Sequence, residues 1–551
     1  MNRILNILTH FRIVLTILSM TFTTSTFSQS NGFEVIRSLE LLDQIYEHLE
    51  KYYVDDLETG KMSKIAIDAM LKELDPYTVY YHESNIEDYQ LMTTGQYGGI
   101  GALIRKNDNF VYISEPYEGN PAEKSGLKAG DKIMEIDGKN MENKSSSDVS
   151  SALKGPKGAD LRIKIERNFE ETKTITVTRD EIKLPDVPYS GMLDETIGYI
   201  KLNSFTRSAS SDVKAAFSAL KNQGMKELVL DLRGNGGGLL IEAVRIVNMF
   251  IDKNQIVVST KGRVVEENHV YKTTEAPMDL EIPLVVLVDK NSASASEIVS
   301  GSLQDLDRAV IIGTQSYGKG LVQRTYNLNY GSKVKLTIAK YYTPSGRCVQ
   351  RLEYYDNKDS GHASEIPDSL VKIFKTKNGR SVIDGRGIDP DINVELKEMS
   401  RLTATIYRNN LLFDFATKYY YAHAAIADAT TFELSDEEYE SFKKYVLDQE
   451  FKYSTASEEM LKEMQKTAEE EGFFEDSEVE FKALMNKVIP SKERDLAKFK
   501  SQIKSLLENE IISRYYYQSG RAKNSFKDDV FIKKSLEVLQ DNRQYNTILR
   551  K

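Results

Sequence analysis

Apolar residues in the first part of the chain repeat with the spacing of an α-helix. After Phe33 the following apolar positions lie three or four residues apart: Leu39, Leu42, Ile45, Tyr46 and Leu49. This spacing puts them on one helix face, and the helical pattern extends to about Met92. Pro76 disfavours a helical conformation at the residue before it, so we expect a helix to stop at residues 74–76.

Short β-branched runs separated by glycines replace this pattern between about residues 95 and 180. They predict a small, separate β-rich unit. The glycines of YGGIG at 97–101 let successive backbone N–H groups converge, and such a nest can hold a carboxylate. A glycine-rich hairpin turn is the alternative. Asn120 and Pro121 predict the start of a short helix, and a second helix, about residues 147–154, places Val149 and Leu153 on one face.

Strand-like and helix-like segments alternate from about residue 181 to residue 397. The apolar run at 227–231 ends in glycines before a helical pattern at 240–250, and the run at 283–288 repeats this arrangement. Such units predict an α/β core. Beyond about residue 400 the chain is helical and rich in Lys, Glu and Tyr, with a capping box at Ser435. We expect this tail to be a solvated helical scaffold or a dimerisation arm.

The composition excludes several classes of protein for this chain. A chain of 551 residues with 40% hydrophobic and 28% charged residues is too long for one core and typical of a soluble multi-domain protein. A net charge of −10 disfavours nucleic acid and anionic membranes as partners. The one cysteine, Cys348, forms no internal disulfide, and the six histidines lack zinc-type spacing. We therefore predict no metal site and no cofactor.

The N-terminus has the pattern of a signal peptide. Arg3 and Arg12 precede an apolar run at 13–20, and a Thr/Ser-rich stretch then leads to Ser28. The run is shorter than a transmembrane helix, so cleavage after Ser28 is expected, with an uncleaved anchor as the alternative. Export without disulfides or a metal site indicates the periplasm or cell envelope of a bacterium.

Three glycine- or serine-rich segments are candidates for chemistry. DLRGNGGG at 231–238 follows a buried strand, so its free N–H groups suit an anion. As a dinucleotide motif it fails, because the third glycine of GxGxxG would fall on Leu239. NSASASE at 291–297 follows the next apolar strand and begins a helix, where a serine hydroxyl can act as a nucleophile. A capped helix is the alternative, and three serines compete for the role.

The third segment, GTQSYGKG at 313–320, is similar in spacing to a phosphate-binding Walker A loop. Gly320 stands where that loop needs a hydroxyl, and a strand rather than a helix follows. A lysine between glycines can instead be desolvated by the surrounding backbone. Burial lowers a lysine's pKa toward neutrality, so Lys319 is a candidate general base.

Together these segments resemble the C-terminal processing peptidases, also called tail-specific proteases. The matching stretches are a PDZ-like order of elements at 97–138, DLRGNGGG at 231–238, SASASE at 292–297, SYGKGLVQ at 316–323, LTIAKYYTPSGR at 336–347 and GIDPDI at 387–392. The resemblance spans about residues 30–397. Arg386 departs from it, standing where relatives commonly have glycine, and the tail beyond residue 400 lies outside it.

The resemblance implies a multi-domain α/β protease core with an inserted PDZ-like β-rich domain and helical N-terminal and C-terminal regions. The expected division is a signal peptide at 1–28, a helical region at 29–94, the PDZ-like domain at 95–180, the protease core at 181–397 and a helical domain at 398–551. The family also implies that PDZ occupancy switches the protease on and that helical termini form a homodimer.

Carried over by position, the family's nucleophile falls on Ser294, its base on Lys319 and a supporting residue on Gln323, which would share a strand face with the lysine. The oxyanion is expected at the N–H groups of Ala295 and Gly238, with Gly237 as the next candidate.

The PDZ-like unit is expected to bind the free, apolar C-terminus of a protein or peptide substrate. Its binding residues would be Gly99, Ile100 and Gly101 for the carboxylate, and Val149 and Leu153 for the last side chain. The rival interpretation is a catalytically inactive PDZ adaptor or chaperone. Such a protein would not need Ser294, Lys319 and Gln323 together.

Overall fold

The computed structural model describes residues 26–83, 86–354, 363–395 and 398–551. The predicted signal peptide, residues 1–28, lies outside these ranges except for its last three residues. The chain forms two compact units, residues 1–73 and 74–551. Within the described ranges no helix is both long enough and apolar enough to cross a bilayer.

The first unit contains two helices, α2 (Thr26–Tyr52) and α3 (Thr59–Lys72). The Tyr46 hydroxyl lies 2.9 Å from the Ser63 hydroxyl and links them. Many apolar side chains of α2 are exposed, among them Phe33 and Leu39. Because α3 ends at Lys72, the predicted stop before Pro76 is confirmed.

The second unit begins with a strand that the helical pattern did not predict. β1 (Val79–Tyr81) pairs antiparallel with β18 (Lys333–Tyr342), and α4 (Ile86–Thr94) follows it. The helical pattern expected to about residue 92 is therefore interrupted by a strand after the predicted helix stop. Valine and tyrosine favour strands, and the distant partner strand settles the conformation.

The PDZ-like module has a sheet in the order β3-β4-β5-β7-β8, with β6 paired to β5. Its elements are β3 (Ala102–Asn107), β4 (Phe110–Pro116), α5 (Pro121–Lys124), β5 (Lys132–Ile136), β6 (Lys139–Asn140), α6 (Ser146–Leu153), β7 (Asp160–Arg167) and β8 (Glu171–Thr178). The chain enters the module through β2 (Gln96–Gly99) and leaves it through β9 (Asp180–Lys183), and these two strands pair with each other. Asn120 precedes α5 as predicted, but its side chain donates to the Glu118 carbonyl rather than capping the helix.

A six-stranded sheet forms the centre of the α/β core, in the order β10-β11-β12-β15-β16-β23. Its strands are β10 (Tyr189–Met192), β11 (Ile197–Lys201), β12 (Glu227–Asp231), β15 (Leu284–Val288), β16 (Val310–Gly313) and β23 (Ile392–Asn393), parallel from β11 onward. Alternate residues point to opposite faces. Leu228 and Leu230 therefore pack toward α7 (Ala209–Asn222), α8 (Leu240–Asn248) and α9 (Ala295–Asp305), whereas Val229 packs on the other face.

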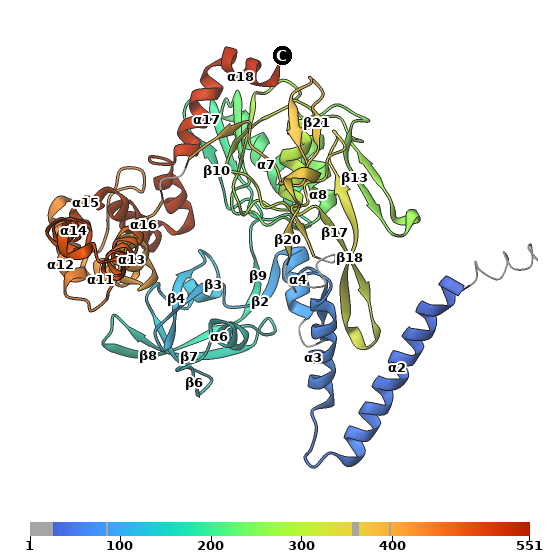
Figure 1. Ribbon diagram of the computed structural model, residues 1–551, viewed down its shortest axis with the longest axis horizontal. Helices are drawn as coiled ribbons and strands as arrows, with labels where there is room; N and C mark the ends of the chain where they lie inside the picture. The colour runs from blue at the N-terminus through green and yellow to red at the C-terminus, as the bar shows by residue number, and fades with distance from the viewer. Residues whose placement is uncertain (1–25, 84–85, 355–362, 396–397) are drawn as a thin grey trace, which may run out of the picture. The chain divides into compact units, whose positions relative to one another are not determined.

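The end of the chain covers that other face of the core sheet. α17 (Val530–Gln540) and α18 (Asn542–Leu549) bury Phe531, Ile532 and Leu549 against strands β11, β12, β15 and β16. Figure 1 shows these helices, in red, beside the core strands. A purely solvated tail was thus an incomplete prediction, because its last helices complete the core.

The remaining elements lie around the core or form a helical bundle with its own apolar centre. Its apolar centre is formed by α10 (Arg401–Arg408), α11 (Leu411–Ala422), α12 (Asp436–Leu447), α15 (Lys492–Lys498) and α16 (Lys500–Ser525). The helices α13 (Ala456–Glu471) and α14 (Phe474–Val488) contact each other. The other strands are β13 (Ile256–Gly262), β14 (Val270–Lys272), β17 (Leu321–Asn327), β19 (Leu352–Glu353), β20 (Ser364–Glu365), β21 (Ile373–Lys375) and β22 (Ser381–Ile383). The predicted capping box at Ser435 is confirmed, with Glu438 as its partner.

Candidate active site

Ser294 occupies the sharp turn between strand β15 and helix α9. Its φ is 57° and its ψ is −112°, a conformation that a residue with a side chain rarely adopts. Such strain persists only where the surroundings enforce it, and it gathers at functional sites. The turn leaves Ser294 partly exposed at the N-terminus of α9.

The two neighbouring serines have structural partners. Ser292 and Ser296 are fully buried, and their hydroxyls donate to the carbonyls of Leu232 and Asn235, both at 2.9 Å. These bonds tie the serine segment to the loop after β12. Of the three serines in the motif, Ser294 is thus the accessible one.

The glycine loop passes directly against Ser294. A Cβ atom on Gly237 would lie 2.8 Å from the Ser294 Cβ and 3.0 Å from the Ala295 nitrogen. The Gly237 N–H donates to Asn235 at 2.9 Å. Across the described ranges, by contrast, no hydrogen bond uses the N–H of Gly238 or of Ala295. The contacts therefore favour Gly238 and Ala295 over Gly237 as free donors.

Lys319 lies in the loop before β17, and its environment favours the neutral amine. Burial, helped by the positive charge of Lys335, lowers the pKa of Lys319 to about 8, although Glu297 and Asp75 act in the opposite direction. Its Nζ lies 4.1 Å from the centroid of the Tyr77 ring. Within the described part of the chain, no hydrogen bond joins Lys319 to the Ser294 hydroxyl.

The strand face that Gln323 was expected to share with Lys319 is not present, because Lys319 lies outside the strand. β17 begins at Leu321, after Lys319, and its pairing has an irregularity between Val322 and Gln323. Alternation along a strand therefore cannot relate the two side chains, and that step of the sequence argument was wrong. The Gln323 amide instead donates to the Thr337 hydroxyl at 3.2 Å.

Glu297 joins the serine turn to the lysine loop, and the sequence reasoning missed it. One carboxylate oxygen accepts from the Ser316 hydroxyl and the Gly318 N–H, both at 2.6 Å. The other accepts from the N–H groups of Ser294 at 2.8 Å and Lys319 at 2.9 Å. Burial raises the pKa of Glu297, and these donors oppose the rise. Its place three residues after Ser294, the capping-box spacing, was the available signal.

Tyr77 is a second residue that the sequence reasoning missed. Its hydroxyl lies 3.3 Å from that of Tyr317 and 3.2 Å from that of Tyr354, while its ring faces Lys319. Asp75 holds the turn by accepting from the Tyr77 N–H at 2.8 Å. In the sequence the Asp-Pro pair indicated only a helix end.

The PDZ-like module presents two free amides at the predicted carboxylate site. No hydrogen bond of the described residues uses the N–H of Ile100 or Gly101, whereas Gly99 lies at the end of the paired strand β2. Gly101 has a φ of 72°, and a Cβ there would lie 2.6 Å from Asn120. Val149 and Leu153 are 0% and 5% exposed in the apolar core of the module, so they do not form an open pocket here.

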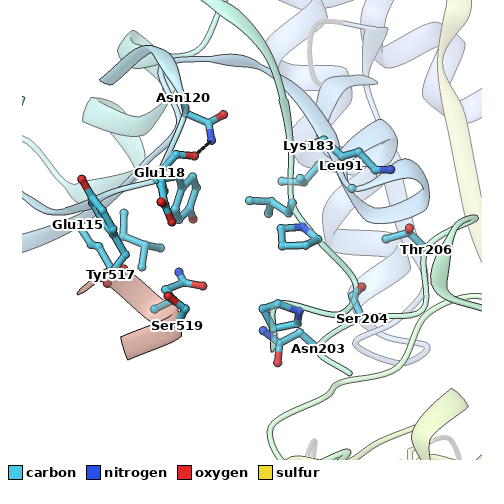
Figure 2. A pocket seen from close by; sticks show the side chains of 17 residues that line it. Leu91, Glu115, Glu118, Asn120, Lys183, Asn203, Ser204, Thr206, Tyr517 and Ser519 are labelled. Carbon is cyan, nitrogen blue, oxygen red and sulfur yellow. Dashed lines mark hydrogen bonds between the residues drawn. The ribbon is translucent and has the colours of Figure 1, made fainter. Parts of the chain in front are cut away.

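A cavity of about 710 Å³ lies between the module, the core and helix α16. Glu115 lines it from the module, Tyr517 from α16, and Asn203, Ser204 and Thr206 from the core (Figure 2). The core wall includes the neighbours of Phe205, whose N–H donates to the Gly237 carbonyl at 3.2 Å. Glu115 is paired with Arg521 through one oxygen, and its other oxygen has no partner among the described residues.

Three family models match separate parts of the chain. Peptidase family S41 matches residues 196–354, the PDZ domain matches 89–166, and the C-terminal helical domain of probable PDZ-proteases matches 402–539.

Similar proteins carry protease names. A carboxy-terminal-processing protease of Bartonella bacilliformis is 37% identical over 328 residues, which are 58% of this chain and 74% of that protein. A probable CtpA-like serine protease of Staphylococcus aureus is 33% identical over 57% of this chain and 62% of its own length. The photosystem II D1 C-terminal processing protease has 28% identity over 64% of this chain and 86% of its own, with a TM-score of 0.36. The chain therefore belongs to the C-terminal processing peptidases, as a serine-type peptidase with a family S41 core and a PDZ domain.

Proposed function

We propose that the protein is a Ser–Lys endopeptidase that binds the free C-terminus of a protein substrate in its PDZ domain and cleaves that substrate in the bacterial cell envelope. The bonds of Glu297 carry this proposal. One buried carboxylate accepts from the backbones of both Ser294 and Lys319, so the proposed nucleophile and base belong to one assembly. A PDZ adaptor would have no use for this link.

The reaction begins with neutral Lys319. Its amine turns from the Tyr77 ring to the Ser294 hydroxyl and removes the proton, and the Ser294 Oγ attacks the scissile carbonyl. The N–H groups of Gly238 and Ala295 stabilise the oxyanion. The protonated lysine then gives its proton to the amine of the scissile bond. The amine departs, and the acyl group stays on Ser294 as an acyl-enzyme. Water, activated by the same amine, releases the acid and restores Ser294.

In this proposal Gln323 supports the site indirectly, through the hydrogen bond that its amide donates to the Thr337 hydroxyl. Gly237 acts by allowing the close approach of its loop to Ser294, since its own N–H is already bound.

Substrate selection is assigned to the PDZ domain. The N–H groups of Ile100 and Gly101 bind the terminal carboxylate, and Gly99, the last residue of β2, precedes them. The last apolar side chain enters beside Val149 and Leu153, and because both are packed in the core, binding requires α6 to shift. In this proposal, that shift is the change by which substrate occupancy switches the protease on.

Location, assembly and domain limits complete the proposal. The signal-peptide pattern supports export to the envelope. Exposed apolar side chains along α2 support a homodimer through helical termini. The proposed domains keep the expected limits, except that α17 and α18 are assigned to the protease core because they pack on its sheet.

The test compares cleavage of an unstructured protein with an apolar C-terminus by the wild type, Ser294→Ala and Lys319→Ala. Both variants are expected to lose cleavage, and an amidated C-terminus is expected to slow the wild type. Wild-type turnover by either variant would contradict the dyad. Substrate binding without any cleavage by the wild type would favour an adaptor, and equal rates for acid and amide would remove carboxylate recognition.

A further inference from the structure

The last segment of the chain reaches the catalytic loop through one carboxylate. Asp529 caps helix α17, and its Oδ1 accepts from the N–H groups of Phe531 at 2.9 Å and Ile532 at 3.2 Å. Arg233 Nη1 lies 2.8 Å from the Asp529 Oδ2 and 3.1 Å from its Oδ1. The position of Asp529 is well fixed, because Phe531 and Ile532 are buried against the core sheet.

Arg233 belongs to the loop that carries the proposed oxyanion donors. Its Nε and Nη2 bind the carboxylate of Asp231, the last residue of β12, the Nη2 at 2.6 Å. Burial would raise the pKa of Asp231, but Arg233 and Lys201 lower it to about 2, so the carboxylate is charged. The guanidinium also lies 4.7 Å from the Phe531 ring. Arg233 is thus held between the core strand and α17.

The loop runs from Arg233 directly to the serine turn. Gly234 donates to Asp289 at 2.9 Å, and the Asn235 carbonyl accepts from the Ala293 N–H at 3.0 Å. Gly237 and Gly238 follow, with Gly237 in contact with Ser294. A displacement of the guanidinium therefore moves a short, tightly bonded segment that ends at the donor groups.

We propose that Asp529 is a positioning residue for catalysis, which holds Arg233 and thereby the loop 233–238 so that Gly238 faces the oxyanion. This inference rests on the proposed Ser–Lys function. Asp529 itself touches no substrate. Its contribution is expected in the transition state rather than in substrate binding, because the donors act on charge that develops during attack.

Asp529→Asn is the most informative variant. Asparagine is as good a helix cap as aspartate, so α17 keeps its N-terminus while the charge opposite Arg233 is lost. Asp528→Asn is the matched control, because Asp528 is 75% exposed and its nearest cation, Lys533, is 3.8 Å away and also exposed. The two variants make the same change, carboxylate to amide, at adjacent positions of the chain.

The assay measures kcat and KM of each variant on an unstructured protein substrate, with Ser294→Ala alongside. For Asp529→Asn we expect kcat to fall about tenfold with KM unchanged within about twofold, because a donor is misplaced rather than removed. Inhibition by a peptide aldehyde, whose adduct carries an oxyanion, should weaken by a similar factor. Asp528→Asn should behave as the wild type.

A wild-type kcat in Asp529→Asn would overturn the inference. An equal fall of kcat in Asp528→Asn would also overturn it, as would an Asp529→Asn enzyme in which only KM changes. The outcomes are separable from a failure of the proposed function. If Ser294→Ala keeps the wild-type rate, the dyad itself is wrong. If Ser294→Ala is inactive while Asp529→Asn has full kcat and unchanged aldehyde inhibition, only the role of Asp529 falls.

Discussion

Replacement of Glu297 by glutamine tests whether one carboxylate holds the serine turn and the lysine loop together. Each oxygen of Glu297 accepts two hydrogen bonds. Glutamine has a single carbonyl oxygen, and its NH₂ group cannot accept from a backbone N–H. If the NH₂ faces Ser294 and Lys319, both of their bonds are lost. If it faces the other pair, the Gly318 bond is lost, and the Ser316 hydroxyl must rotate to become an acceptor.

The size of the effect follows from those bonds. A hydrogen bond to a charged group contributes about 1.5–3 kcal/mol, so the loss of one or two bonds amounts to about 1.5–6 kcal/mol. That is a large part of the roughly 5–15 kcal/mol by which a typical domain is stable. Because the lost donors belong to the loops at 294 and 316–319, the loops should separate before the whole core unfolds.

The assay for Glu297→Gln is kcat/KM on an unstructured protein, together with a thermal melt. We expect kcat/KM to fall at least about 100-fold, the scale of a lost catalytic arrangement. Glu508→Gln is the matched control, since Glu508 is also buried and accepts from a backbone N–H but lies in α16. A Glu297→Gln enzyme with wild-type kcat/KM would refute the reasoning.

Three further predictions concern single positions. Lys319→Met should abolish cleavage and raise the free energy of unfolding at pH 7 by about 1–3 kcal/mol, because a lysine with a lowered pKa destabilises the fold while it is protonated. Denaturant titrations should show that this gain in stability disappears as the pH rises from about 8, the pKa in the folded protein, toward 10.5, the pKa in the unfolded chain. Gly238→Ala should reduce kcat about 100-fold, since its Cβ would lie 2.4 Å from the Phe205 carbonyl oxygen. Gly101→Ala should raise KM for substrates with a free C-terminus and leave amidated ones unchanged, because its Cβ would press on Asn120.

The local pattern of the chain was sufficient for much of the fold. Alternating apolar residues in β7, and the apolar runs of β12 and β15, predict strands whatever lies around them. Two features depend on distant partners. β1 exists because β18 pairs with it, and α17 belongs to the core because it covers a sheet face. Periodicity shows that a helix has an apolar face, but not which surface that face covers.

The candidate site divides in the same way. The choice of Ser294 among three serines came from the family resemblance, and the bonds of Ser292 and Ser296 now supply a physical reason. The capping-box spacing indicates the bond of Glu297 to Ser294. The bonds of Glu297 to residues 316–319 and the contact of Tyr77 with Lys319 are long-range, and spacing along the chain does not reveal them. A strand period was the wrong guide for the lysine because that residue precedes the strand.

The central claim is that a neutral lysine removes the serine proton, and the pH dependence of kcat/KM tests it most directly. This quantity reports the pKa of the free enzyme's essential base. Cleavage by the wild type should rise with pH along a single acid limb with an apparent pKa of about 8, the value to which burial lowers Lys319. An acid limb near pH 6.5, the value of an ordinary histidine, or near an ordinary lysine's 10.5 would contradict the account.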